Sequence, residues 1–248
     1  MKRVLSGIRA NSDLTLGNYL GALKPWVELQ GRAETDEVEY LFFVPNLHSL
    51  SDRVNPAELR GRTLSNVALY IAAGLDPAKV TLYVQSQVPA NTELSWIFNN
   101  YVTIGELSRM TQYKEKLTKR GPEGQLASIF NYPILMAADI LLYSADEVPV
   151  GDDQRQHVEL ARDIATRFNN LYGPIFTLPK ATHPKSGARV MNLQDPTSKM
   201  SKSDEDASGN VMLTDTAEVM RHKITRAVTD SKNNVKAGKA QPAITNLL

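Results

Sequence analysis

Two segments of the 248-residue chain contain residue types that can bind phosphate. The first, Thr15-Leu16-Gly17-Asn18, follows the first apolar run and lies where a loop passes into a helix. The free N–H groups at the start of a helix favour phosphate, and glycine lets a ligand approach the backbone closely. Because threonine and asparagine are also frequent capping residues, an ordinary helix cap with a packing glycine is the alternative interpretation.

The second segment is Lys199-Met200-Ser201-Lys202-Ser203, within a polar stretch at residues 197–210. Two lysines three residues apart on a loop can neutralise the charge on a departing pyrophosphate. A lysine- and serine-rich loop can equally be a solvated linker. The five residues therefore have a phosphate-binding interpretation and a linker interpretation.

A third feature is Asp139, which lies in the apolar segment 135–142. A carboxylate within so apolar a helix is costly to bury unless a hydrogen-bond donor meets it. Asp139 therefore either faces solvent or accepts a hydrogen bond from a buried donor. The N–H of an indole is one such donor, because it can donate but not accept.

The scaffold for these residues is expected to alternate short strands with longer helices. Strands are expected at residues 3–6, 40–44, 80–84, 147–150 and 189–193, and helices at 17–30 with a kink at Pro25, 56–74, 92–100, 105–116, 125–143 and 153–168. This alternation predicts an α/β fold with a parallel sheet covered on both faces. Parallel sheets bind ligands at the carboxyl ends of their strands, so the loops after Ser6, Val44 and Val150 are candidate sites.

Composition excludes several classes of protein. The chain has 28 basic and 27 acidic side chains, and its net charge of +1 does not by itself indicate a nucleic-acid partner. It has no cysteine and no H-E-x-x-H pattern, so we expect no disulfide and no resident metal. It contains neither a P-loop nor G-x-G-x-x-G, so any ATP site must use another arrangement. No apolar run approaches the roughly 20 residues of a membrane span, and no secretory signal is recognisable, so we expect a soluble cytoplasmic protein.

Together these segments resemble the class I aminoacyl-tRNA synthetases, and closely the bacterial tryptophanyl type. Residues 199–203 match the K-M-S-K-S motif of the class in all five positions. Residues 15–18 are similar to the tryptophanyl variant of its H-I-G-H tetrapeptide, about 180 residues earlier, as in the family. Further runs similar to the family are 17–23, 105–112, 136–143, 148–151, 153–154, 187–191 and 227–231.

This resemblance implies a Rossmann-like doubly wound parallel sheet. Residues 1–193 would form the catalytic nucleotide-binding domain. Residues 194–248 would contain the K-M-S-K-S loop and the beginning of a helical anticodon-binding domain that is truncated. The implied activity is ATP-dependent activation of L-tryptophan to tryptophanyl-adenylate, with Mg²⁺ bound to the substrate, followed by transfer to tRNA(Trp). The resemblance also implies a homodimer.

The resemblance further implies the role of individual residues. The catalytic residues would be Thr15, Asn18, Lys199 and Lys202. Further ATP contacts would come from Arg9, Ala10, Asn11, Gly17, Gly151, Asp152, Asp153, Val190, Met191, Met200, Ser201 and Ser203. Tryptophan would be bound by Gly7, His48, Tyr132, Met136, Asp139, Val148, Val150 and Gln154. In this set Asp139 would accept the indole N–H, and His48 has a purely structural role as its alternative.

The loop after the first strand departs from the family pattern. The family has Gly-x-Gln-Pro-Ser-Gly where this chain has Gly7-Ile8-Arg9-Ala10-Asn11-Ser12. Arg9 could bind a carboxylate or phosphate more strongly than a neutral amide does, or could damage the geometry. Two further alternatives remain open: tyrosine specificity, and a weakly catalytic paralogue that senses tryptophan or binds RNA. The basic stretch 109–120 would meet the acceptor end of tRNA or be a solvated helix face.

Overall fold

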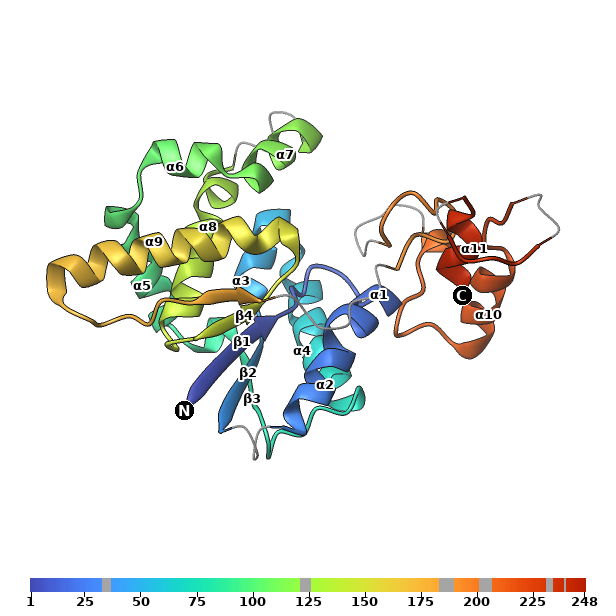
Figure 1. The fold of residues 1–248 in the computed structure, drawn as a ribbon, viewed down its shortest axis with the longest axis horizontal. Coiled ribbons are helices and arrows are strands. Elements are labelled where there is room, and N and C mark those ends of the chain that lie inside the picture. Colours follow the sequence, from blue (N-terminus) through green and yellow to red (C-terminus); the bar gives the residue numbers. More distant parts are fainter. Residues whose placement is uncertain (33–36, 121–125, 183–189, 201–206, 231–233, 239) are drawn as a thin grey trace.

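The computed structural model describes residues 1–32, 37–120, 126–182, 190–200, 207–230, 234–238 and 240–248 (Figure 1). Its centre is a five-stranded sheet in which every neighbouring pair of strands is parallel. In chain order the strands are β1 (Lys2–Gly7), β2 (Val38–Val44), β3 (Thr81–Val84), β4 (Glu147–Pro149) and β5 (Lys180–Thr182). Across the sheet they lie in the order β3-β2-β1-β4-β5, so the direction of winding reverses between β1 and β4.

Helices connect and cover these strands. In chain order they are α1 (Leu16–Asn18), α2 (Lys24–Gln30), α3 (Asn46–Ser49), α4 (Pro56–Ala72), α5 (Ala90–Phe98), α6 (Ile104–Arg109), α7 (Thr111–Arg120), α8 (Ala127–Leu141), α9 (Arg155–Tyr172), α10 (Ala217–Thr225) and α11 (Pro242–Leu247). Within the described ranges, none of them combines the length and the apolar character that crossing a membrane requires.

Alternate side chains of β1 enter two separate hydrophobic cores, because successive residues of a strand point to opposite faces. Val4 packs with Trp26 of α2 and Tyr70 of α4 on one face. Leu5 packs on the other face in a cluster that includes Ile134 of α8 and residues of α9. Helices thus cover both faces of the sheet (Figure 1), which confirms the expected doubly wound α/β fold.

Most expected elements are present, with small shifts of their ends. The four strands expected before residue 151 correspond to β1–β4. Asn55 caps α4, since its Oδ1 accepts the Ala57 N–H at 3.0 Å. The helix expected at 105–116 is instead the pair α6 and α7, because Met110 between them has an extended backbone with ψ 126°.

The helix expected at residues 17–30 changes its winding midway. Between α1 and α2 lies a π-helical turn, Tyr19–Leu23, and Pro25 occupies the first turn of α2. Proline has no N–H to donate, and its ring collides with the carbonyl four residues earlier, so it cannot continue a regular α-helix. The irregularity expected at Pro25 therefore takes the form of a wider turn directly before it.

The strand expected at residues 189–193 is wrong. The fifth strand is β5, and of residues 190–193 only Met191 forms an isolated bridge, with Lys199. Arg189 lies outside the described residues. β5 is short, and Ala181 is its only apolar residue, so it gives little sequence signal. Leu193 is apolar for another reason, since it packs with residues that follow it.

The described residues from 190 onward form a smaller unit beside the start of α1 (Figure 1). Its hydrophobic cluster is built on Leu193, Met200 and Val211. The unit is joined to α1 by a backbone hydrogen bond of 2.8 Å from the Leu16 N–H to the Val211 carbonyl. The domain boundary at 193/194 stays a prediction, and Leu193 packs with residues on the far side of it.

Glu106→Gln is expected to lower stability at neutral pH by about 1–2 kcal/mol. Glu106 caps α6 through Thr103 and pairs with Arg167 of α9. Mainly because of the Arg167 hydrogen bond, its pKa is lowered from 4.5 to about 2. A lowered folded-state pKa gives stability that is complete above pH 4.5 and lost as the pH falls toward 2. Melting curves should show the deficit of the variant at pH 7 and its disappearance near pH 2, whereas the exposed Glu93→Gln control should match the wild type throughout.

Candidate functional site

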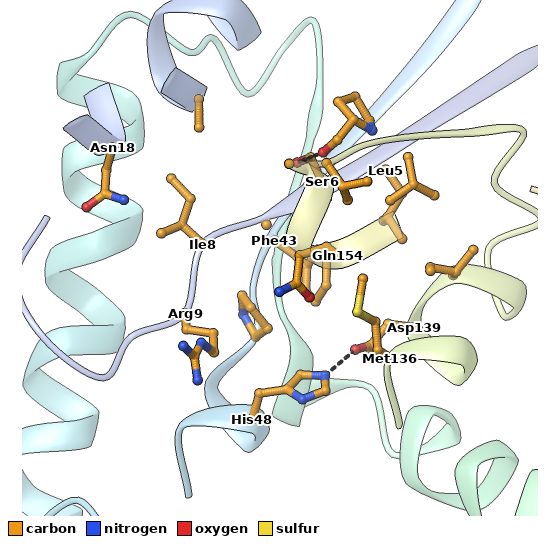
Figure 2. A pocket seen from close by; sticks show the side chains of 18 of the residues that line it. Leu5, Ser6, Ile8, Arg9, Asn18, Phe43, His48, Met136, Asp139 and Gln154 are labelled. Carbon is orange, nitrogen blue, oxygen red and sulfur yellow. Dashed lines mark hydrogen bonds and ion pairs between the residues drawn. The ribbon is translucent and has the colours of Figure 1, made fainter. Parts of the chain in front are cut away.

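A cavity of about 400 Å³ opens where the strand order reverses, at the carboxyl ends of β1, β2 and β4. The loops that follow these strands contribute Ile8, Pro45 and Gly151 to its lining, and α8 contributes Met136. Figure 2 shows side chains from these elements facing a common space. The volume is within the range of small-molecule sites, about 300–1,000 Å³. A ligand-sized cavity therefore lies where the parallel sheet leads one to expect it.

The structure brings together all the residues that the sequence suggests for tryptophan. Those lining the cavity are Gly7, His48, Tyr132, Met136, Asp139, Val148, Val150 and Gln154. Of the residues suggested for ATP, the cavity is also lined by Arg9, Asn18, Gly151 and Lys199. Segments almost 200 residues apart in the sequence thus border one space.

Asp139 is the buried charge of this cavity, with 2% of its surface exposed. Its Oδ2 lies 2.8 Å from Nε2 of His48 (Figure 2). Gln85 donates through Nε2 to both carboxylate oxygens, at 2.7 Å and 2.9 Å. Hydrogen bonds from two partners offset the cost of burying the carboxylate. The solvent-facing alternative for Asp139 is therefore wrong.

His48 and Gln85 reach Asp139 from the ends of two neighbouring strands. β2 is followed by Pro45 and then α3, which carries His48 with 8% of its surface exposed. β3 is followed directly by the 3₁₀ turn Gln85–Gln87. Gln85 is not among the residues that the sequence suggests for the site. A polar side chain immediately after an apolar strand of a parallel sheet is the signal that could have found it.

Tyr132 is held by a second histidine, His157, which is also not among the residues that the sequence suggests for the site. The Tyr132 hydroxyl lies 2.7 Å from Nε2 of His157, and the Lys116 ammonium lies 4.1 Å from the centre of the Tyr132 ring. Burial lowers the pKa of His157 to about 4, so its imidazole is neutral near pH 7. Burial also raises the pKa of Tyr132, which keeps its proton. Tyr132 thus presents a neutral, anchored ring to the cavity.

Thr15 and Asn18 form a reciprocal cap at the start of α1. The Asn18 Oδ1 accepts the Thr15 N–H at 3.0 Å, and Thr15 Oγ1 accepts the Asn18 N–H at 3.4 Å. Thr15 is only 1% exposed, whereas Asn18 lines the cavity. The two residues therefore form a helix cap, Asn18 is the member of this pair that also lines the cavity, and a phosphate contact of either residue stays a prediction.

Arg9 lies between the cavity and a second, polar hollow of about 590 Å³. Its Nη1 is 3.8 Å from Oδ2 of Asp52. Asn11 lines the second hollow and donates to the same Asp52 oxygen at 3.0 Å, whereas Ala10 is fully buried. The altered loop therefore directs a cation, and not an amide, toward the shared border of the two spaces.

The family model described as tRNA synthetases class I (W and Y) matches residues 1–248, the whole chain. The chain belongs to this family of class I tRNA synthetases. A tryptophan–tRNA ligase from Clostridium tetani is 51% identical over 247 residues, which cover 100% of this chain and 71% of that one.

Two solved structures agree with this assignment. The crystal structure of tryptophanyl-tRNA synthetase from Mycoplasma pneumoniae is 40% identical, with a TM-score of 0.86 over 99% of this chain and 71% of that one. The tryptophanyl-tRNA synthetase from Campylobacter jejuni, complexed with ADP and tryptophan, is 36% identical, with a TM-score of 0.82 over 96% and 70%.

In this class I tRNA synthetase the two segments that resemble the class motifs lie side by side. A Cβ atom built on Gly17 would lie 3.8 Å from the Val190 Cβ and 3.9 Å from the Met200 Cβ. Met200 is 4% exposed, and its N–H donates to the Val190 carbonyl at 2.9 Å. Lys199 precedes it and lines the cavity. The last three residues of the motif, Ser201, Lys202 and Ser203, lie outside the described residues.

The backbone of Met191, suggested as an adenine contact, already has partners. Its N–H donates to Oδ1 of Asn246 at 2.8 Å, and its carbonyl accepts from Nδ2 of the same side chain at 2.9 Å. An adenine that bonded to this backbone would have to replace Asn246. Asp152 and Asp153, suggested for the ribose, are exposed in a 3₁₀ turn before α9.

Gly7→Ala is expected to destabilise this synthetase by about 1–3 kcal/mol and to raise the KM for the amino acid. A Cβ atom at Gly7 would lie 2.8 Å from the ring and the carbonyl oxygen of Phe43, closer than such atoms approach in proteins. Relief requires a shift of β1 or β2 beside the cavity. Denaturant midpoints and ATP–pyrophosphate exchange measure the two effects. Gly61→Ala, with no atom within 4 Å of the new Cβ, is the matched control. Equal stability of the two variants would contradict this reading of Gly7.

Proposed function

We propose that this protein is a tryptophan–tRNA ligase, which activates L-tryptophan with ATP to tryptophanyl-adenylate and transfers it to tRNA(Trp). The observation that carries the proposal is the buried carboxylate of Asp139 in a cavity with mostly uncharged walls. An indole has a single polar atom, whose N–H can only donate, and a carboxylate is its natural acceptor. The relative from Clostridium tetani that carries this name, and the Campylobacter jejuni enzyme complexed with ADP and tryptophan, support it.

The uncharged walls of the cavity suit the rest of the indole. Gly7, Met136, Val148 and Val150 line it without a formal charge. Tyr132 adds its anchored ring. In the proposed complex these residues enclose the indole rings, and Gln154 lies near the polar end of the amino acid.

Activation begins when the tryptophan carboxylate attacks the α-phosphorus of ATP in line. The bond from that phosphorus to the bridging oxygen breaks, and pyrophosphate leaves. This chemistry depends on positioning and on charge neutralisation. Asn18 contacts phosphate oxygens, and Lys199 with Lys202 stabilises charge on the leaving group. Mg²⁺ enters as part of the substrate, bound to the ATP phosphates. A terminal hydroxyl of tRNA then attacks the acyl carbon, and AMP leaves.

Further ATP contacts are proposed for residues that lie beside the cavity. Gly17 lies at the start of α1 beside Val190 and Met200, and its proposed ATP contact is through the backbone N–H groups of that helix start. Gly151, Asp152 and Asp153 lie beside the cavity at the start of α9, where exposed carboxylates can accept hydrogen bonds from ribose hydroxyls. Arg9, at the edge of the cavity, offers a cation to the tryptophan carboxylate or the α-phosphate.

Two macromolecular partners are proposed. Large apolar side chains are exposed on α5, α6 and the end of α9, where Trp96 and Ile104 are each 76% exposed and Leu171 is 68% exposed. Exposed apolar side chains of this size suit the self-association of a homodimer, and sedimentation should give a dimer that Trp96→Lys converts to monomer. The second partner is tRNA, whose acceptor end would meet the basic residues Lys114 and Lys116 of α7. A cytoplasmic location is proposed with these partners.

The deciding experiment is tryptophan-dependent exchange of pyrophosphate into ATP, with tyrosine and phenylalanine as competing substrates. Exchange that requires tryptophan supports the proposal. Exchange with tyrosine alone would replace it with the tyrosine-specific alternative. Tryptophan binding by calorimetry without any exchange would favour the sensing paralogue, whose basis is the altered loop at Arg9.

A further inference from the structure

Gln85 is a buried polar side chain to which the proposed reaction assigns no role. It is fully buried at the start of its 3₁₀ turn, directly after β3. Its Nε2 lies 2.7 Å from Oδ1 and 2.9 Å from Oδ2 of Asp139, so one amide group spans both carboxylate oxygens. Oδ2 also contacts Nε2 of His48 at 2.8 Å, so Oδ1 is the oxygen with fewer partners.

The backbone determines which way the Gln85 amide faces. Its Oε1 lies 3.0 Å from the N–H of Leu47 in α3. Since a backbone N–H can only donate, Oε1 must face Leu47, and Nε2 must then face Asp139. The flipped amide would set its oxygen against the carboxylate and its NH₂ against the N–H. The Gln85 carbonyl in turn accepts a hydrogen bond from Nδ2 of Asn91 at 3.3 Å, which ties its backbone to α5.

A donor fixed in this way constrains the orientation of Asp139. The NH₂ group of Gln85 can only donate, and it spans both carboxylate oxygens, so it requires that these oxygens face it as acceptors. The titratable groups that face Asp139 are His48 from α3, Tyr83 from β3 and Tyr143 after α8. Burial raises the pKa of both tyrosines, so neither brings a charge near pH 7. Gln85 therefore holds Asp139 as an acceptor.

We propose that Gln85 is a positioning residue for the choice of amino acid, acting through Asp139. It fixes the plane of the carboxylate, so that a free lone pair is directed at the indole N–H. The inference rests on the proposed function. It predicts an effect on the preference for an N–H-bearing side chain, with little effect on the chemical step.

Gln85→Met removes the donor and approximately keeps the volume. Exchange kinetics should be measured with tryptophan and with β-(3-benzothienyl)alanine, in which sulfur replaces the indole N–H. The kcat/KM for tryptophan should fall roughly 10- to 100-fold, the size of one hydrogen bond to a charged group. The analogue makes no bond to Asp139, so its value should change far less. Gln87→Met, on the exposed side of the same turn, is the matched control.

Gln85→Glu gives a second, independent measurement. It keeps Oε1 for the Leu47 N–H but sets a carboxyl oxygen against Asp139. Two carboxyl groups this close share a proton, and one pKa of the pair rises. Below that pKa the new carboxyl donates as Gln85 does, and above it the two charges repel. The KM for tryptophan, relative to wild type at each pH, should therefore increase as the pH rises.

The possible outcomes distinguish a failure of the inference about Gln85 from a failure of the proposed function. A smaller ratio of tryptophan to analogue in Gln85→Met, with Gln87→Met unchanged, supports the proposal. If kcat/KM falls equally for both substrates, the ratio of tryptophan to analogue is unchanged. That result indicates a structural role only and overturns the proposal. If Gln85→Met does not fold, a pH-independent KM ratio in Gln85→Glu overturns it. Absence of exchange in the wild type would overturn the proposed function and this inference together.

Discussion

Asp139→Asn will lower kcat/KM for tryptophan by roughly 10²- to 10⁴-fold in pyrophosphate exchange. The carboxylate has two oxygens, and the structure already directs His48 and the Gln85 amide at them. The amide of the variant has one acceptor oxygen and an NH₂ group that can only donate. Because Nε2 of Gln85 contacts both oxygens of Asp139, the NH₂ group of the variant faces the NH₂ group of Gln85 in either amide orientation, which sets donor against donor in a buried space.

The effect of Asp139→Asn should be specific to recognition. Asp163→Asn, an exposed carboxylate on α9, is the matched control and should keep wild-type kinetics. The thermal midpoint of each variant shows whether folding has changed. Exchange that is undiminished in a folded Asp139→Asn protein would remove Asp139 from tryptophan recognition. It would leave the cavity without its proposed selectivity element.

Lys199→Ala will lower kcat by about 10²- to 10³-fold, as the loss of one group that stabilises developing charge does in other enzymes. Lys199 lines the cavity, and the adjoining Met200 packs into the C-terminal hydrophobic cluster. This attachment holds the lysine at the opening of the cavity. The charge that it neutralises appears on the leaving pyrophosphate, so the KM for tryptophan should change little.

Lys180→Ala is the comparison for this variant, because Lys180 is an exposed lysine on β5. Steady-state exchange at saturating tryptophan, with ATP varied, separates kcat from KM. A Lys199→Ala protein with normal kcat and a raised KM for ATP would show that the lysine binds the ground state only. The electrostatic role in the reaction would then be wrong.

The fold could be predicted from the sequence where apolar runs are long. The strand around Leu41 and the helix around Ile164 bury their apolar residues in the core, and Leu82 of β3 is half-buried against it, so their patterns reflect the fold directly. β5 could not be predicted, because an edge strand of three residues needs few apolar side chains. The apolar residues at 190 and 193 were misleading, because they belong to the separate C-terminal cluster.

The residues of the candidate site also differ in whether the sequence predicts them. Five of its eight tryptophan positions, Met136, Asp139, Val148, Val150 and Gln154, lie within short runs that resemble the family, and all eight line one cavity. Gln85 has only its place directly after an apolar strand as a signal, and His157 has none, because a lone histidine on a helix has no pattern that distinguishes it. Their roles depend on contacts across 54 and 25 residues, to Asp139 and Tyr132 respectively. Only the assembled sheet brings these partners together.

The backbone pairing between α1 and the C-terminal unit links two regions that are 200 residues apart in sequence. Leu16 donates to Val211, and Leu213 donates to Leu14, each at 2.8 Å. Separating the unit from the sheet must break the pairing that flanks the Thr15 cap. A nucleotide held at that cap would therefore slow proteolysis and amide exchange in the last sixty or so residues, although it need touch few of them.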